Sequence, residues 1–232
     1  MIKILDSNNP IRVAKLWLAG RMGHSFPANS ISEWAGNHAM SYVGPTASRQ
    51  YQLSGEFGGK PWTIERRIAS RAFIKGDELN GRAALNVLSS PVVIVMNRSL
   101  KESLEKQAYE IYTDPVRTLA EPSLSEEMRW IALYPECPQF SVSRDFHQAF
   151  SVLAADAVDA TRWVSDELIQ LVLACRLNCR DTPFVLMMLR GKVYLQLEMS
   201  MTCDELAALS NSVDIFRLAS TSALRHFPKP VV

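Results

Sequence analysis

The alternation of apolar and polar residues predicts two β-hairpins, one in each half of the chain. Apolar residues or glycine occupy every second position in Tyr51–Phe57, and the same spacing returns in Trp62–Ile68 with Arg66 among the apolar set. A second pair of runs, Phe184–Leu189 and Val193–Met199, meets at a short turn that contains glycine. Because successive side chains of a strand point to opposite faces and glycine permits tight turns, each pair is expected to form an antiparallel hairpin.

Further strands and helices are expected between and around these hairpins. Short runs rich in β-branched or aromatic residues predict strands at 72–74, 92–96 and 150–154. Apolar stripes of helical period, several of them behind a Ser, Thr or Asp cap, predict helices. These helices cover 11–19, 30–40, 78–87, 100–111, 124–131, 158–163, 165–178 and 206–216.

Two hairpins separated by helices indicate an α+β fold, in which the hairpins pack with several amphipathic helices in one layer or two. Both hairpins could contribute to one sheet, or each could carry its own helices. The stretch Thr113–Ser123 has the weakest apolar pattern, so the best candidate boundary lies there. We therefore expect an N-terminal half, residues 1–120, and a C-terminal half, residues 121–232, which could also form one continuous domain.

Composition is typical of a globular protein and removes several classes of partner. The 232 residues are 47% hydrophobic and 21% charged, which suits a packed core and argues against intrinsic disorder. Lys and Arg number 25 against 24 Asp and Glu, which gives a formal net charge of +1. Because positive and negative charges are nearly equal in number, there is no general electrostatic attraction to nucleic acid or to an anionic membrane. Neither is therefore expected as the main partner.

The sequence has neither the pattern of a membrane span nor that of a secretory signal. No window approaches the ~18 apolar residues of a spanning helix, and residues 1–10 become polar before an apolar run develops. A cytoplasmic location is therefore expected, where Cys137, Cys175, Cys179 and Cys203 would be small buried hydrophobic residues. Because Cys175 and Cys179 lack further ligands at zinc-site spacing, no metal is expected.

The last third of the chain carries a distinctive series of residues. In order, they are Phe146, Phe150, Val152, Asp156, Ala160, Ser165, Leu168 and Val193-Tyr194-Leu195. This series resembles a bacterial family of unknown function, which has Phe-x-Val, an acidic residue and Ala before a Ser/Thr-capped helix and a final hairpin. Members often carry membrane-spanning segments ahead of this region, whereas this sequence has none. The resemblance covers residues 146–199 and implies a strand, helices and a hairpin, but no activity and no catalytic residue.

Established catalytic signatures are missing from the sequence. It contains no Gly-x-Ser-x-Gly nucleophile elbow, no His-Glu-x-x-His metalloprotease helix and no Gly-x-Gly-x-x-Gly dinucleotide loop. The segment Gly76–Ala83 has the glycine spacing of a phosphate loop, but it lacks the Lys-Ser/Thr pair and carries two acids where a phosphate would sit. We expect Asp77 to cap a helix there instead, and we expect no cofactor.

Three arginines in and after the first hairpin are the most suggestive charges. Arg66 belongs to the apolar face of its strand, whereas Arg67 and Arg71 belong to the other face. A buried guanidinium keeps its proton and must hold a carboxylate or an anionic ligand, so Arg66 rather than Arg67 is expected to have a fixed partner. A structural partner would come from the nearby acids Glu56, Glu65 and Asp77. The functional hypothesis is an anion site of Arg66, Arg67 and Arg71, with His147.

Two tryptophans and a pair of acids complete the candidate residues. Trp17 and Trp34 lie in short predicted helices beside glycine-containing loops, where aromatic residues anchor either a core or an interface. Asp156 and Asp159 could act as paired acids. However, Asp156 stands at a helix start and is first a cap, and Asp159 is placed to pair with Arg162.

These observations favour a non-catalytic, cytoplasmic module that makes protein–protein contacts, self-association included. The basis is that the catalytic signatures tested are absent and that the charge is close to neutral. The alternative is an enzyme or a small-anion-binding protein that uses Arg66, Arg67 and Arg71. A concave pocket that contains those arginines would favour the alternative.

Overall fold

The structure, a computed structural model, describes residues 28–88, 90–113, 124–178, 182–199 and 205–229. Its strands are β1 (Ser41–Val43), β2 (Arg49–Phe57), β3 (Lys60–Ile68), β4 (Asp77–Ala83), β5 (Val93–Asn97), β6 (Phe150–Ala154), β7 (Phe184–Leu189) and β8 (Lys192–Met199). Its helices are α2 (Ala28–Asn37), α3 (Arg98–Thr113), α5 (Glu126–Leu133), η1 (Pro138–Val142), α6 (Arg144–Ala149), α7 (Ala157–Trp163), α8 (Asp166–Asn178) and α9 (Glu205–His226). The predicted helix at 11–19, Trp17, Cys179 and Cys203 lie outside the described residues.

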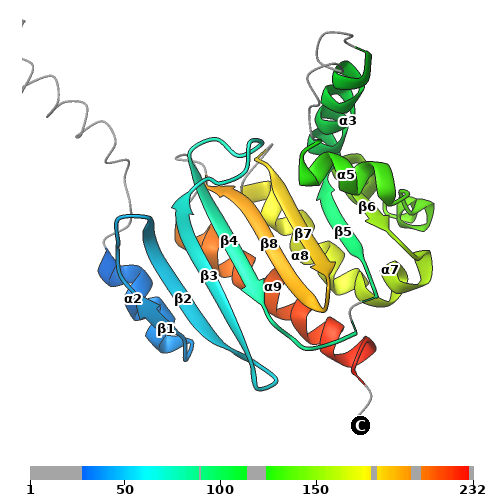
Figure 1. The fold of residues 1–232 in the computed structure, drawn as a ribbon. Helices are drawn as coiled ribbons and strands as arrows, with labels where there is room; N and C mark the ends of the chain where they lie inside the picture. Colours follow the sequence, from blue (N-terminus) through cyan, green and yellow to red (C-terminus); the bar gives the residue numbers. More distant parts are fainter. Residues whose placement is uncertain (1–27, 89, 114–123, 179–181, 200–204, 230–232) are drawn as a thin grey trace, which may run out of the picture.

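All eight strands form one antiparallel sheet, in the order β1-β2-β3-β4-β8-β7-β5-β6 (Figure 1). The α+β class is therefore confirmed, and so are both hairpins, β2–β3 and β7–β8. The hairpins share the sheet, because β4 pairs with β8 and places Gly81 opposite Leu195. The turn between β7 and β8 has Arg190 and Gly191 at φ values of 52° and 70°, which is the left-handed backbone of a tight hairpin turn.

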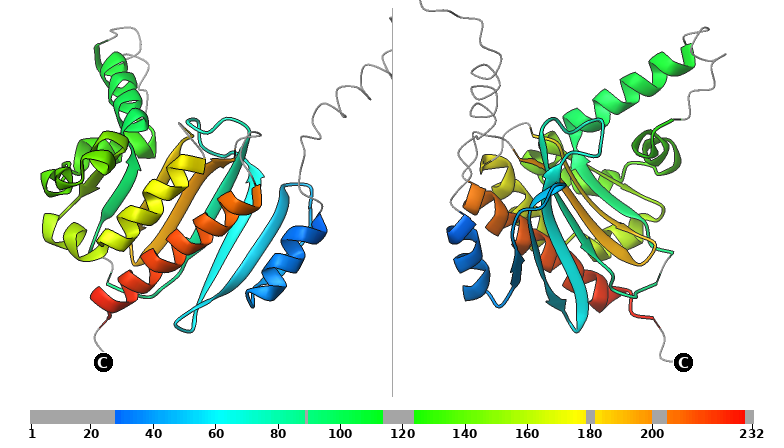
Figure 2. Two further views of the ribbon diagram at one scale, coloured as in Figure 1. Left: turned by 180° about the vertical axis from the view of Figure 1, so that it is seen from behind. Right: turned by 60° about the vertical axis from the view of Figure 1, so that its left-hand side comes forward.

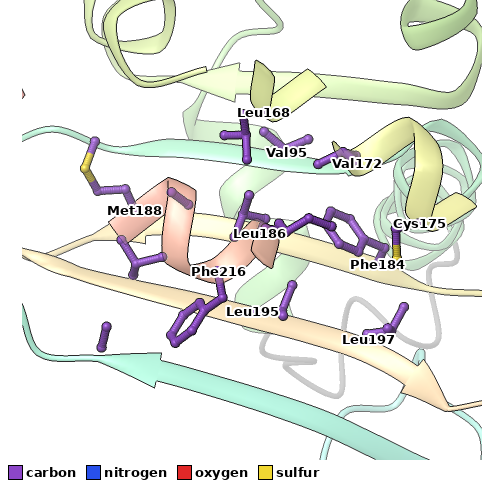
Figure 3. Close-up of a cluster of buried hydrophobic side chains, with 14 of the residues drawn as sticks. Val95, Leu168, Val172, Cys175, Phe184, Leu186, Met188, Leu195, Leu197 and Phe216 are labelled. Atoms are coloured by element: carbon purple, nitrogen blue, oxygen red, sulfur yellow. The ribbon is translucent and has the colours of Figure 1, made fainter. Parts of the chain in front are cut away.

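One face of the sheet packs against α8 and α9, which cross it side by side in the view from behind (Figure 2). Figure 3 shows this core, where Val172 of α8 and Phe216 of α9 meet Leu186 of β7 and Leu195 of β8. Asp156 caps α7 by accepting a hydrogen bond from the Val158 backbone N–H, as the sequence predicts. The helix-covered face therefore forms the larger of two hydrophobic clusters.

The opposite face is divided between two kinds of surface. Over β5, β6 and β7 it is apolar, and α3 and α5 cover it with a second cluster that includes Met96, Val185, Met187 and Trp130. Over β2, β3, β4 and β8 the residues that point the same way are mostly polar. Figure 1 looks onto this face, with α8 and α9 behind the strands. Half of this side of the sheet is thus left without a covering helix among the described residues.

Two predicted elements are wrong, and both lie after the first hairpin. The segment predicted as a helix at 78–87, with Asp77 as its cap, begins instead with strand β4. Its small residues fit a central strand, since a Cβ on Gly81 would lie 3.1 Å from the Cβ of Leu195. The strand predicted at 72–74 is a loop that turns back between β3 and β4, with Ile74 buried.

Ile68 of the apolar set in β3 and Trp34 of α2 both lie close to the surface. Ile68 ends β3 beyond the core and is 70% exposed. Trp34 is only partly buried, because α2 uses Ile31 and Ala35 to contact the core. Within the part of the chain that the structure describes, no helix is both long and apolar enough to cross a membrane.

Candidate functional site

Arg66 lies on the helix-covered face of β3, where it joins carboxylates from two other elements. Its Nη2 lies 2.9 Å from Oδ2 of Asp77 on β4, and its Nη1 donates a hydrogen bond to Oε1 of Glu205 at the start of α9. Arg66 and Glu205 are both buried. The predicted carboxylate partner is confirmed for Asp77. Glu205 is a second partner that no local sequence pattern indicates.

The charges around Arg66 stabilise one another. Burial alone would lower the pKa of the Arg66 guanidinium, but the hydrogen bonds and charges of Glu205 and Asp77 raise it above its ordinary value. Burial and the adjacent Glu205 carboxylate raise the pKa of the Tyr51 hydroxyl, so this group stays protonated. Gln50 also donates a hydrogen bond to Asp77, at 2.6 Å. The single cation is shared by two carboxylates, so the cluster offers no free positive charge to an anion.

Arg67 points to the other side of the sheet and also has an acidic partner, so the prediction that only Arg66 would have one is wrong. Its Nη2 lies 3.4 Å from Oε1 of Glu78, which is fully buried. Glu78 also accepts hydrogen bonds from the Ser70 backbone N–H at 2.9 Å and from Asn80 Nδ2 at 2.7 Å. Burial would raise the pKa of Glu78, but these hydrogen bonds and the Arg67 charge lower it overall.

Glu78 is expected to make the stability of the protein sensitive to acid. Because its pKa is lowered from 4.5 on folding, it stabilises the fold above that value, and the contribution is lost as the pH falls through the folded pKa. Glu78→Gln should be less stable than the wild type at neutral pH, and the difference should shrink as the pH falls to about 3. Urea unfolding across this range measures the effect, with Glu102→Gln on exposed α3 as the control. A difference that does not change with pH would contradict the assignment.

Arg71 lies in the loop between β3 and β4 and ties that loop to α5. Its Nη1 lies 2.7 Å from Oε1 of Glu127 and 3.2 Å from Oε2 of Glu126. The same loop is held at its other end, where the Lys75 backbone N–H donates to Glu198 at 2.7 Å. The three predicted arginines therefore each hold acids of their own chain, and they do so on both sides of the sheet.

His147 lies far from these arginines. It belongs to α6, just before β6, and the sheet order places β4, β8, β7 and β5 between β6 and the arginine-bearing β3. At about 4.8 Å per strand, this separation is roughly 24 Å. Its ring Nδ1 lies 3.1 Å from Nη2 of Arg98, which also holds Glu136 at 2.8 Å. The hydrogen bond from Arg98 lowers the pKa of Glu136 against the opposing effect of its burial.

The remaining sequence candidates take structural positions. Trp34 contacts His38, with ring centroids 4.6 Å apart and the two rings tilted by 33°. Asp156 caps its helix, and burial together with the Asp156 charge raises the pKa of Asp159. Cys175 is buried on α8, in the core. Among the described residues, no three His, Cys, Asp or Glu side chains are grouped so that they could hold a metal ion.

Two hollows in the surface have none of the three arginines in their lining. One, of about 720 Å³, is bounded by η1, α7 and the start of α8, and its lining includes Phe140, Thr161 and Asp166. The other, of about 420 Å³, lies between α3 and the β3–β4 loop, with Ser103 and Glu198 on its wall. Neither hollow has Arg66, Arg67 or Arg71 in its lining. Neither hollow is therefore the arginine-containing pocket that would favour an anion-binding function.

The uncovered half of the sheet is the remaining candidate, and we call it the open face. Its exposed or partly exposed members include Gln52, Ser54, Glu56, Thr63, Glu65, Arg67, Asn80, Arg82, Lys192, Tyr194 and Glu198. They form rows across four strands, since Ser54 pairs with Thr63, Thr63 with Arg82, and Arg82 with Tyr194. Sequence reasoning gave no functional role to Arg82, Lys192 or Tyr194, although the alternation of polar positions along β4 and β8 was an available signal.

Comparison with known proteins assigns no family. No family model matches the chain, and no curated protein matches it. Among solved structures, the chain is similar to the crystal structure of the mycobacterial trehalose monomycolate transport factor A, TtfA. The two share 11% sequence identity over 88% of this chain and 97% of the other, with a TM-score of 0.49. At that level of similarity the comparison gives this chain neither a family nor a function.

Proposed function

We propose that this protein is a non-catalytic binding module that holds a protein partner on its open face. The observation that carries this proposal is the contrast within one side of one sheet. Helices α3 and α5 cover the half formed by β5, β6 and β7, whereas the half formed by β2, β3, β4 and β8 carries polar side chains and no helix of the described residues. A broad, regular surface of this kind suits another protein better than a small ligand.

The rigidity of the open face supports the same proposal. On one side, Arg66 connects β3 to β4 and α9; on the other, Glu78 holds Arg67 and the start of the loop. Arg71 then fixes that loop to α5. A surface whose backbone is already ordered loses little conformational entropy when a partner docks, and interfaces of this type are about as polar as the rest of a protein surface.

The alternative of an enzyme or small-anion-binding protein has less support. An anion at Arg66, Arg67 or Arg71 would have to displace carboxylates that already bind these side chains. For the compartment, we propose the cytoplasm, because Cys137 is a buried free thiol, as is usual in a reducing environment.

Site-directed cross-linking in the native cell tests the proposed function. A photo-reactive benzoylphenylalanine replaces Thr63 at the centre of the open face, and the same residue replaces exposed Thr221 on α9 as the control. We expect a discrete protein adduct from position 63 only. The adduct should vanish when Ser54→Arg adds bulk to the same face, and it should persist with Thr221→Arg.

The mass of the adduct identifies the partner, and an adduct to a second copy of this chain would assign self-association. Identical products from positions 63 and 221, or no product from position 63, would contradict the proposed function. Melting temperatures of the variants must match that of the wild type, so that lost adducts report lost docking and not lost folding.

A further inference from the structure

Some charged side chains of the open face form ion pairs and others do not. At one end, Arg49 Nη1 lies 3.7 Å from Oε1 of Glu65, and Arg67 is paired with buried Glu78. At the other end, Arg82 on β4 and Lys192 on β8 form no ion pair with any described residue. Arg82 and Lys192 are therefore unpaired positive charges close to the point where β4 ends and β8 begins, whereas Glu56 and Glu198, the acids of this face that form no ion pair with a described residue, lie on β2 and near the end of β8.

Tyr194 lies within this positive region. The strand register places it directly opposite Arg82, and it shares the open face with Lys192, which lies two residues earlier on the same strand. One side of Tyr194 packs against the second hydrophobic cluster, so its ring is anchored although it remains partly exposed. An anchored tyrosine beside an exposed arginine is the composition found at the energetic centres of protein interfaces.

We propose that the open face recognises an acidic segment of its protein partner, with Arg82 and Lys192 binding carboxylates and Tyr194 packing against the aliphatic parts of that segment. This inference rests on the proposed function, because it names the chemistry of the partner at the same surface. Charge complementarity supplies the argument: a carboxylate can occupy the Arg82–Tyr194–Lys192 region without displacing an existing ion pair.

The remaining charges of the face favour a protein over a nucleic acid as the source of the negative charge. Glu56 lies on β2, two strands away from Arg82, and Glu65 and Glu198 lie along the same side of the sheet. A phosphate backbone running across the strands would meet these acids, and binding to nucleic acid normally needs many more cations than two. A short acidic segment can lie across the ends of β4 and β8 that carry Arg82 and Lys192, away from Glu198 at the other end of β8.

Titration with an octaglutamate peptide, followed by two-dimensional NMR of the ¹⁵N-labelled full chain, tests the inference. We expect shifts confined to amides of β3, β4 and β8 around Thr63, Arg82 and Tyr194, and binding that weakens as salt screens the charges. Arg82→Glu should lower the affinity about tenfold, because it turns an attraction into a repulsion. Arg217→Glu, an equivalent reversal on exposed α9, should leave it unchanged.

Two outcomes would overturn the inference. The first is an absence of shifts, or shifts centred elsewhere on the molecule. The second is tighter binding of an oligothymidylate of equal charge at the same amides, which would assign the region to phosphate. The cross-linking experiment separates this inference from the proposed function. If the adduct from position 63 still forms in Arg82→Glu, the protein partner is supported, but the inference that its docking segment is acidic is wrong.

Discussion

Arg66→Ala is expected to destabilise the protein by on the order of 3 kcal/mol, one of the two largest losses we predict. The guanidinium is the shared cation of Asp77 and Glu205, and Glu205 is buried. Removing the guanidinium leaves two carboxylates close together, one of them without solvent to compensate it. Equilibrium urea unfolding at neutral pH measures the difference in the free energy of unfolding.

Arg67→Ala is the matched comparison for Arg66→Ala, since the two residues are neighbours on the same strand. Its expected cost is about 1 kcal/mol or less, because Arg67 is one-third exposed and Glu78 keeps its hydrogen bonds from Ser70 and Asn80. Arg217→Ala, which removes an exposed pair with Asp214, should cost still less. Equal, small losses for Arg66→Ala and Arg67→Ala would show that the buried cluster does not hold in solution.

Trp163→Ala is expected to cost about 3–5 kcal/mol, the range for truncating a large buried aromatic residue. Trp163 is fully buried at the end of α7, and its Nε1 donates to the Ala219 carbonyl of α9 at 2.9 Å. The side chain thus joins α7 to the helix that covers the sheet. Trp163→Phe keeps much of the ring and loses the hydrogen bond, so its cost should be intermediate, at roughly 2 kcal/mol.

Trp34→Ala provides a tryptophan control for Trp163→Ala in the same protein. Trp34 is only partly buried on α2, so its loss should cost about 1 kcal/mol. Thermal unfolding monitored by circular dichroism ranks the three variants. If Trp34→Ala were as damaging as Trp163→Ala, the contact between α2 and the sheet would contribute more to stability than its burial indicates.

The sequence pattern was sufficient for the elements that carry large apolar residues. The hairpins β2–β3 and β7–β8 and the helices α3, α5, α7 and α8 follow from alternation or from stripes behind a cap. Strand β4 was missed because its inward positions are Leu79, Gly81 and Ala83, two of which are too small to mark a core face. Their size is a tertiary requirement, since Leu195 lies against Gly81. Every second residue from Leu79 to Val87 is buried, but the small residues among them kept the hydrophobic pattern from indicating a strand.

The candidate site was predictable only in part, because it depends on contacts between distant segments. The local pattern correctly indicates that Arg66 needs a carboxylate, but Glu205 lies 139 residues away along the chain. The open face follows from which strands the helices leave uncovered, and that in turn depends on β4 pairing with β8. No property of Arg82 or Tyr194 alone reveals that they lie opposite each other.

The pairing of β4 with β8 also determines when the fold can be completed during synthesis. Asp77 pairs with Met199, about 120 residues later, whereas β2, β3 and β4 follow one another closely in the chain. On the ribosome, β2–β4 can therefore pair as a meander while the inner edge of β4 stays unpaired until β8 emerges. An unpaired strand edge next to apolar residues is a site for aggregation, and contacts so distant in sequence slow folding. The edge of β4 is consequently open to such pairing from its own synthesis until β8 has been made.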